Sequence, residues 1–205
     1  MSLQPLYSPS SIAIIGASTD KKKFGGRPID YMQRTGYQGT IYPVNPRVEE
    51  VQGLKAYKDV RDIDAPIDLA LIAVPASGCV EAARACAEAG VKAVVVIASG
   101  FAESDGEGEG GRWQAELTQI ATSSGMRILG PNCMGSLSAH NGAVTTFASF
   151  FDIQEPRPGG IAIATQSGAV GGYTLVLALQ RPQEAGHGRS EEHTSELQSQ
   201  FRISY

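Results

Sequence analysis

The sequence predicts an α/β protein with a parallel sheet that is covered by helices on both faces. Short apolar runs rich in β-branched residues alternate with helix-like segments between Ser11 and Leu129, which is the pattern of β-α-β units joined by right-handed crossovers. Many of the 24 glycines directly follow these runs, as in proteins whose backbone lines a ligand site. With 205 residues, 42% of them hydrophobic, the chain is long enough to bury a core without disulfides or metals.

Five main strands are predicted, with helices between them. The strand segments are almost continuously apolar, which is typical of parallel strands buried on both faces. Gly36 and Gly90 mark helix ends, since glycine is favoured just past the last helical turn. The predicted strands span residues 11–15, 40–44, 67–74, 93–97 and 127–129, with a shorter one near 54–57, and the predicted helices span 27–35, 80–89 and 111–124.

Charge and cysteine usage exclude several classes of protein. The net charge of −4 argues against nonspecific nucleic-acid binding, which needs a basic surface, but allows a local basic pocket for one anionic ligand. No apolar stretch approaches the roughly 18 residues of a membrane span, and the N-terminus does not resemble a signal peptide. The three cysteines lack CxxC spacing, so neither a disulfide framework nor a metal site is expected. These features predict a cytoplasmic protein.

The loop after the first strand is the first candidate ligand loop. In open parallel sheets, ligands bind at the carboxyl ends of the strands, where the strand order reverses. Gly16-Ala17-Ser18-Thr19 joins a strand to a helix, and its backbone amides are expected to bind phosphate. The match to GxGxxG is imperfect because the next glycines are Gly25 and Gly26, so a purely structural turn is the alternative.

The end of the second strand indicates which nucleotide binds. NAD sites place an acid there to bind the ribose hydroxyls, but the sequence reads Val44-Asn45-Pro46-Arg47. Arg47 favours an additional phosphate, so NADP or coenzyme A (CoA) fits better than NAD. The alternative is that Arg47 is a solvated surface charge.

The loops after the later strands supply further candidates. Val74-Pro75 forms a rigid turn, and Ser99-Gly100-Phe101 is expected to offer free backbone amides and one aromatic ring to an adenine or a pantetheine arm. An ordinary crossover loop is the alternative for the second of these. Asn132, after the last strand, carries an amide that can donate and accept hydrogen bonds.

No catalytic residue is predicted. Cys133 has no paired base in the sequence and is expected to pack in the core, as are Cys79 and Cys86. His140 is expected at the surface. Ser167 misses the GxSxG pattern of hydrolases, but Ser167-Gly168 precedes a helix and is a candidate anion site.

The chain is expected to contain one complete domain and the start of another. The first domain spans residues 6–150, a linker spans 151–159, and a strand–helix unit at 160–180 begins the second. Its helix is apolar and should dock on the first domain or leave an exposed apolar patch. Residues 181–205 lack a sustained hydrophobic period, and 189–199 resemble the translation of a sequencing adapter. A disordered, non-native tail is therefore predicted from about Arg181.

Six short motifs in order resemble the α-type portion of NDP-forming acyl-CoA synthetases, the superfamily of succinyl-CoA ligase. Each motif is weak alone, but their order along residues 6–180 is specific. Pat-type protein lysine acetyltransferases share this N-terminal portion. The motifs are Ile14-Ile-Gly-Ala-Ser18, Tyr42-Pro-Val-Asn-Pro46, Ala73-Val-Pro75, Ser99-Gly-Phe101, Gly130-Pro-Asn-Cys133 and Gln166-Ser-Gly-Ala169.

The resemblance implies a Rossmann-like CoA-binding domain followed by a truncated flavodoxin-like ligase domain. It assigns CoA phosphate to Gly16–Thr19, the nucleotide end to Arg47, pantetheine to the turns at Val74-Pro75 and Ser99-Gly100, and phosphate to Ser167-Gly168. The intact enzyme would convert an acid, CoA and ATP with Mg²⁺ to acyl-CoA, ADP and phosphate. The phosphorylated histidine and the ATP-grasp domain or subunit of the family have no match here, so the chain is expected to be a CoA-binding fragment.

Two other functions remain open from the sequence. One is the N-terminal part of a lysine acetyltransferase, and the other is a stand-alone module that binds CoA or NADP. The acyl substrate and the oligomeric state are not specified by these motifs.

Overall fold

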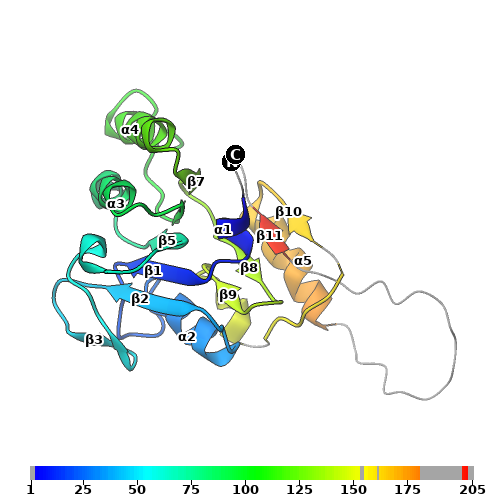
Figure 1. Ribbon diagram of the computed structural model, residues 1–205. Helices are drawn as coiled ribbons and strands as arrows, with labels where there is room; N and C mark the ends of the chain where they lie inside the picture. The colour runs from blue at the N-terminus through cyan, green and yellow to red at the C-terminus, as the bar shows by residue number, and fades with distance from the viewer. Residues whose placement is uncertain (1–2, 153–154, 161, 181–199, 203–205) are drawn as a thin grey trace, which may run out of the picture.

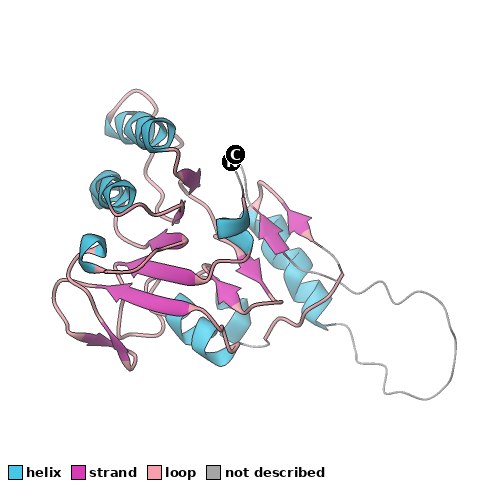
Figure 2. Ribbon diagram, viewed as in Figure 1, coloured by secondary structure: helices cyan, strands magenta, loops and turns pink. Residues whose placement is uncertain are grey.

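The computed structural model describes residues 3–152, 155–160, 162–180 and 200–202. Figures 1 and 2 show a layered α/β unit with a smaller group of strands and a helix beside it. In the described part of the chain, no helix is long and apolar enough to cross a membrane.

A five-stranded parallel sheet forms the centre of the layered unit. Its strand order is β2-β1-β5-β6-β7, and every neighbouring pair is parallel. The order reverses between β1 and β5, and in open parallel sheets ligands bind at the carboxyl ends of the strands at such a point. The strands are β1 (Ser11–Ile15), β2 (Thr40–Val44), β5 (Leu69–Ile72), β6 (Ala93–Val96) and β7 (Arg127–Leu129), which confirms the predicted Rossmann-like sheet.

Helices cover both faces of this sheet. Figure 1 shows α3 (Ala76–Glu88) and α4 (Glu109–Ser124) together on one side, and α2 (Arg27–Arg34) on the other. A four-residue helix, α1 (Gln4–Tyr7), precedes β1. Helix α3 begins four residues before the predicted start, because Pro75 takes the extended N-cap conformation and the helix continues directly from it.

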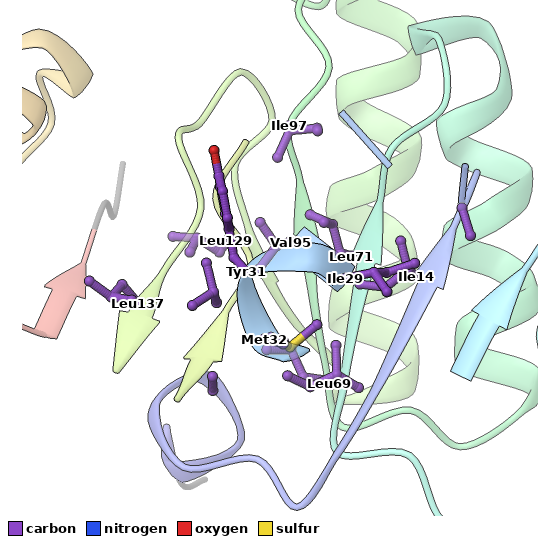
Figure 3. Close-up of a cluster of buried hydrophobic side chains, with 14 of the residues drawn as sticks. Ile14, Ile29, Tyr31, Met32, Leu69, Leu71, Val95, Ile97, Leu129 and Leu137 are labelled. Atoms are coloured by element: carbon purple, nitrogen blue, oxygen red, sulfur yellow. The ribbon is translucent and has the colours of Figure 1, made fainter. Parts of the chain in front are cut away.

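Alternate residues of the central strands enter two separate cores. In β1 and β5, Ile12, Ile14, Leu69 and Leu71 pack toward α2, as Figure 3 shows for three of them. Their neighbours pack toward α3 and α4 because successive side chains of a strand point to opposite faces. Each fully buried large aliphatic side chain stabilises the fold by about 1.5–3 kcal/mol, so burial on both faces fixes the sheet firmly.

Shorter elements surround the sheet. A two-stranded hairpin, β3 (Glu50–Val51) and β4 (Leu54–Lys55), follows β2. A second sheet has the order β10-β11-β8-β9. Its strands are β8 (Leu137–Ser138), β9 (Ala143–Val144), β10 (Ile163–Ala164) and β11 (Gln200–Arg202), and two short 3₁₀ helices span Val60–Asp62 and Ser149–Asp152.

The helix of the strand–helix unit is α5 (Gly168–Gln180). It was expected either to dock on the first domain or to leave an apolar patch exposed, and the structure shows both. Leu175 is 1% exposed and belongs to the core that also contains α2. Val170, Tyr173 and Leu177 are 58%, 67% and 47% exposed. One face of α5 is therefore docked, and the opposite face presents apolar side chains to solvent.

Three residues of the predicted tail lie among the described residues. Gln200–Arg202 form β11, which pairs in parallel with β10 and antiparallel with β8. The unpaired backbone groups of edge strands are a ready template for such pairing. The rest of the predicted tail, residues 181–199 and 203–205, lies outside the described residues.

Candidate ligand-binding site

Gly16 brings the loop after β1 against the loop after β5. Its φ is +83°, and a Cβ there would lie 2.5 Å from the Ala73 carbonyl oxygen and 2.9 Å from Val74 Cγ1. An L side chain would therefore meet both a strained backbone and a steric clash. Glycine at this position lets the two loops meet at the point where the strand order reverses.

Three of the four backbone amides that the sequence predicts to bind phosphate, those of Gly16, Ala17 and Ser18, are already hydrogen-bonded. The N–H groups of Gly16 and Ala17 donate to the Val44 carbonyl at 3.1 and 3.2 Å, and the Ser18 N–H donates to Gly25 at 3.3 Å. Two of these bonds go to the end of β2 and one goes to Gly25 in the same loop, because α2 starts only at Arg27 and buried amides need partners. An anion at this loop is therefore left with the Thr19 amide and with side chains.

Three consecutive lysines supply such side chains. Lys21, Lys22 and Lys23 are exposed in the loop after β1. Lys21 pairs with Asp30 at 2.6 Å, whereas Lys22 and Lys23 form no ion pair with any described residue. The sequence reasoning did not single them out, although three adjacent cations in a predicted ligand loop are a readable signal.

Asn45 links the loop after β2 to the loop after β1. Its Nδ2 donates to the Ala17 carbonyl at 2.8 Å, and its Oδ1 accepts from the Arg47 N–H at 2.8 Å. Arg47 is exposed, and its guanidinium forms no ion pair within the described part of the chain. The two loops thus place unpaired cations on the same edge of the sheet, on neighbouring strands.

The loop after β6 differs from the expectation. Glu103 accepts from the Gly100 N–H at 2.7 Å and from the Phe101 N–H at 3.2 Å, so these amides are not free. The Phe101 ring is fully buried and packs edge-on against Trp113, and it cannot grip a ligand without leaving the core. Ser99 is exposed, and so is Pro75 at the end of the neighbouring strand. Both residues therefore remain available to contact a ligand.

The loop after β7 is fixed against the loop after β6. The Asn132 N–H donates to the Ala98 carbonyl at 2.9 Å, and the Asn132 side chain is exposed. Cys133 is buried, and burial raises the pKa of its thiol to about 11. Burial likewise raises the pKa of Cys79 and Cys86 to about 12. All three cysteines are core residues, as predicted, and none is activated as a nucleophile.

Ser167 and Gly168 lie at the start of α5. Ser167 Oγ accepts from the Val170 N–H at 3.3 Å, so the serine caps its own helix. A Cβ on Gly168 would lie 2.5 Å from Met134 Cγ, which shows that α5 begins against the loop after β7. His140, farther along the chain, is exposed as expected.

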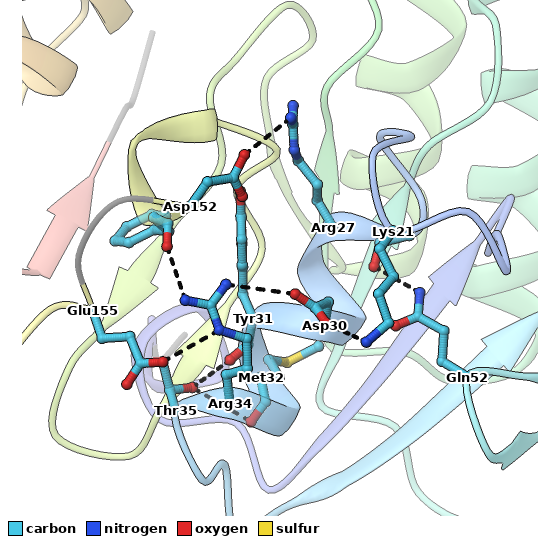
Figure 4. A network of polar contacts seen from close by, with 12 residues as sticks. Lys21, Arg27, Asp30, Tyr31, Met32, Arg34, Thr35, Gln52, Asp152 and Glu155 are labelled. Carbon is cyan, nitrogen blue, oxygen red and sulfur yellow. Dashed lines mark hydrogen bonds and ion pairs between the residues drawn. The ribbon is translucent and has the colours of Figure 1, made fainter.

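Hydrogen bonds and ion pairs connect the segment after β9 to α2. This helix follows the loop after β1, which we call the lysine loop because it contains Lys21, Lys22 and Lys23. Figure 4 shows the network: the Tyr31 hydroxyl donates to Asp152 at 2.7 Å, Arg27 contacts the same carboxylate at 3.2 Å, and Arg34 contacts Glu155 at 3.3 Å. Burial, followed by the bond to Asp152, raises the pKa of Tyr31 well above its usual range. The phenol therefore stays a donor, and the network fixes the start of α2.

A separate groove of about 450 Å³ lies between α4 and β7. Gln114, Leu117 and Thr118 line one wall, and Met126 and Arg127 line the other. None of the side chains predicted to bind a ligand lines this groove. The groove is therefore distinct from the candidate site at the strand ends.

Comparison with known proteins identifies the family of this chain. The family described as "CoA binding domain" matches residues 10–139. The chain belongs to the CoA-binding domain family. The match covers β1 to β8 and all the loops at the carboxyl edge of the main sheet.

Relatives and solved structures extend the likeness beyond this domain. The chain is 44% identical over 170 residues to subunit alpha of an ADP-forming acetate–CoA ligase of Pyrococcus furiosus, covering 82% of this chain and 35% of the relative. An ADP-forming acetate–CoA ligase of Methanocaldococcus jannaschii is 39% identical over 178 residues, covering 86% and 24%. The chain therefore corresponds to the CoA-binding portion of such ligases and spans about a third of the Pyrococcus relative.

Two solved structures share the fold. A dinucleotide-forming acetyl-CoA synthetase of Ca. Korarchaeum cryptofilum, solved with phosphate and ADP, has a TM-score of 0.79 at 37% identity, covering 87% of this chain and 37% of that one. A Pyrococcus horikoshii protein has a TM-score of 0.81 at 38% identity, covering 98% and 41%.

Proposed function

We propose that this chain binds CoA at the loops after β1 and β2, as the CoA-binding portion of an ADP-forming acyl-CoA ligase. The observation that carries the proposal is the set of exposed cations on two neighbouring loops, at the point where the strand order reverses. The end of β2 carries no acid to bind a ribose diol. CoA, with its diphosphate and its 3′-phosphate, matches a site of this charge and position.

Each part of CoA has an assigned contact in this proposal. The phosphates contact Ser18, Thr19 and Arg47, with the lysines at 21–23 beside them. Charge-assisted bonds of this kind are about twice as strong as neutral ones. The pantetheine arm runs across the turns at Val74-Pro75 and Ser99-Gly100 toward Asn132, and Ser167-Gly168 lies beyond it beside Met134. The buried Phe101 ring takes no part.

The reaction is proposed for the complete protein. The names of the relatives, ADP-forming acetate–CoA ligase and 4-hydroxybutyrate–CoA ligase, support a small carboxylic acid as acyl substrate, with ATP and Mg²⁺ bound by an ATP-grasp domain or subunit. The residues described here bind and orient CoA, and the proposal places the protein in the cytoplasm, where these substrates occur.

Calorimetric titration of the 205-residue chain tests the proposal. CoA is expected to bind, and NAD is expected to show no measurable heat. NADPH is the informative third ligand, because it also carries an adenosine diphosphate with an additional ribose phosphate, at the 2′ instead of the 3′ position, but lacks pantetheine. Binding of NAD as tight as that of CoA would overturn the assignment, and NADPH binding tighter than CoA would indicate a dinucleotide module instead.

A further inference from the structure

An unusual residue occupies the tip of the β3–β4 hairpin. Val51 pairs with Leu54, which leaves Gln52 and Gly53 as a two-residue turn with φ values of 53° and 83°. Such turns favour Asn, Asp or Gly, which tolerate a positive φ. Glutamine has no such advantage, so the local turn does not explain why it is there.

The hydrogen bonds of the Gln52 side chain explain why a glutamine occupies this turn position. Its Nε2 donates to the Ser18 carbonyl at 3.0 Å and to the Gly26 carbonyl at 2.9 Å, and Figure 4 shows it next to Lys21. Both partners are carbonyl oxygens, so only the amide NH₂ can serve them. Gln52 Oε1 is buried and accepts no hydrogen bond within the described part of the chain. The side chain is therefore committed to its two donor contacts.

These two contacts close the lysine loop. Ser18 lies near its start and Gly26 at its end, where α2 begins, and the three lysines lie between them. The hairpin tip is itself fixed, since Val51 is fully buried and Gln33 of α2 donates to the Gln52 carbonyl at 3.0 Å. A rigid hairpin thus carries the amide that holds both ends of the loop together.

We propose that Gln52 is a positioning residue that clamps the β1–α2 loop in the shape that presents Thr19 and the lysines to the phosphates of CoA. This inference rests on the proposed function. Gln52 acts through the loop and does not touch CoA itself. An asparagine would suit the turn better but is one methylene too short to reach both carbonyls.

The variant Gln52→Asn distinguishes the role of Gln52 in holding the lysine loop from its role in the hairpin turn. Its urea midpoint should stay close to that of the unmodified chain, because the preference of asparagine for the turn offsets part of the two lost hydrogen bonds. Its Kd for CoA should nevertheless rise by about tenfold, the size expected from lost hydrogen bonds. Hydrogen exchange at the Ser18 and Gly26 amides should become faster, while exchange in β5 and β6 stays unchanged. A purely structural role predicts no loss of affinity in a variant of undiminished stability.

Gln52→Glu is the second variant, with the same length but no N–H at neutral pH. Its carboxylate faces two carbonyl oxygens, so CoA should bind more weakly than to Gln52→Asn. Affinity relative to the unmodified chain should partly recover near pH 5, because a protonated carboxyl regains one donor. Gln38→Glu is the matched control, since Gln38 is exposed and its side chain donates to the Gly36 carbonyl in its own turn. It should bind CoA as the unmodified chain does.

The outcomes separate this inference from the proposed function. Unchanged exchange at Ser18 and Gly26 in Gln52→Asn overturns the clamp, whether or not CoA binds. Faster exchange with a Kd within twofold of the unmodified value overturns the positioning role. Failure of the unmodified chain to bind CoA counts against the proposed function, and the exchange data then decide the clamp alone.

Discussion

The loops after β1 and β6 leave the same edge of the sheet but use their polar groups in opposite ways. Both follow a buried apolar strand, both contain a glycine with positive φ, at Gly16 and Gly100, and both were predicted to bind a ligand through backbone amides. In the first loop, the amides of Gly16, Ala17 and Ser18 donate to backbone carbonyls of the protein, and the lysines are exposed. In the second, the carboxylate of Glu103 covers the amides and the aromatic ring is buried.

The difference teaches that a glycine after a strand identifies a loop at the ligand edge but not what the loop does there. Most backbone amides at such a loop find partners in the protein itself, because an unsatisfied buried N–H is costly. Side-chain charge is what remains available. Lys22, Lys23 and Arg47, which form no ion pair with any described residue, lie on the loops after β1 and β2, and the proposed phosphate contacts follow them.

The largest expected effect concerns the two glycines. Gly16→Ala should lower the free energy of unfolding by about 2–4 kcal/mol, from a left-handed backbone and a steric clash together. Gly100→Ala should cost only about 1–2 kcal/mol, because its Cβ would meet nothing closer than Ala76 Cβ at 3.5 Å. Urea denaturation measures the free energy of unfolding of both variants. Equal decreases in the two variants would show that the close approach of Gly16 to Ala73 does not affect stability.

The second prediction places the ligand at the cationic loops. Arg47→Glu should weaken CoA binding by about 1–3 kcal/mol, because it removes a charge-assisted contact and adds repulsion. Arg127→Glu is the control, because it changes the net charge by the same amount. Arg127 starts β7, at the opposite edge of the sheet from β2. Isothermal titration should show a shift for the first variant only. A Kd unchanged by Arg47→Glu would mean that the guanidinium points to solvent.

The third prediction tests the buried ring of the β6 loop. Phe101→Leu should lower the free energy of unfolding by about 1–2 kcal/mol, because buried contacts are lost. The Kd for CoA should stay the same, since the ring lies in the core against Trp113. A marked loss of affinity without a loss of stability would return Phe101 to the ligand site.

The smallest expected effect concerns the cysteines. Burial holds the thiol pKa of Cys133 at about 11 and those of Cys79 and Cys86 at about 12, so almost no thiolate is present at pH 8. A thiol reagent should label none of them in the folded chain and all three after unfolding. Rapid labelling of Cys133 in the folded chain would make it a candidate nucleophile.

The sheet could be predicted from the sequence because each of its strands carries a strong local pattern. Ser11–Ile15 and Ala93–Val96 are apolar on both faces and bounded by turn residues, and both are strands in the structure. The Glu103 contacts could not be predicted, because a flexible acidic segment gives no local sign of folding back on its own loop. The Gln52 clamp depends on a contact across 34 residues of sequence, which no periodicity reveals.

Amide chemical shifts of the 205-residue chain, followed during titration with CoA, test the central claim most directly. The account predicts large changes in residues 17–26 and 45–49, smaller ones near Ser99, and none along α4 and β7. Changes confined to the groove at Leu117 and Arg127, with the cationic loops unaffected, would contradict it.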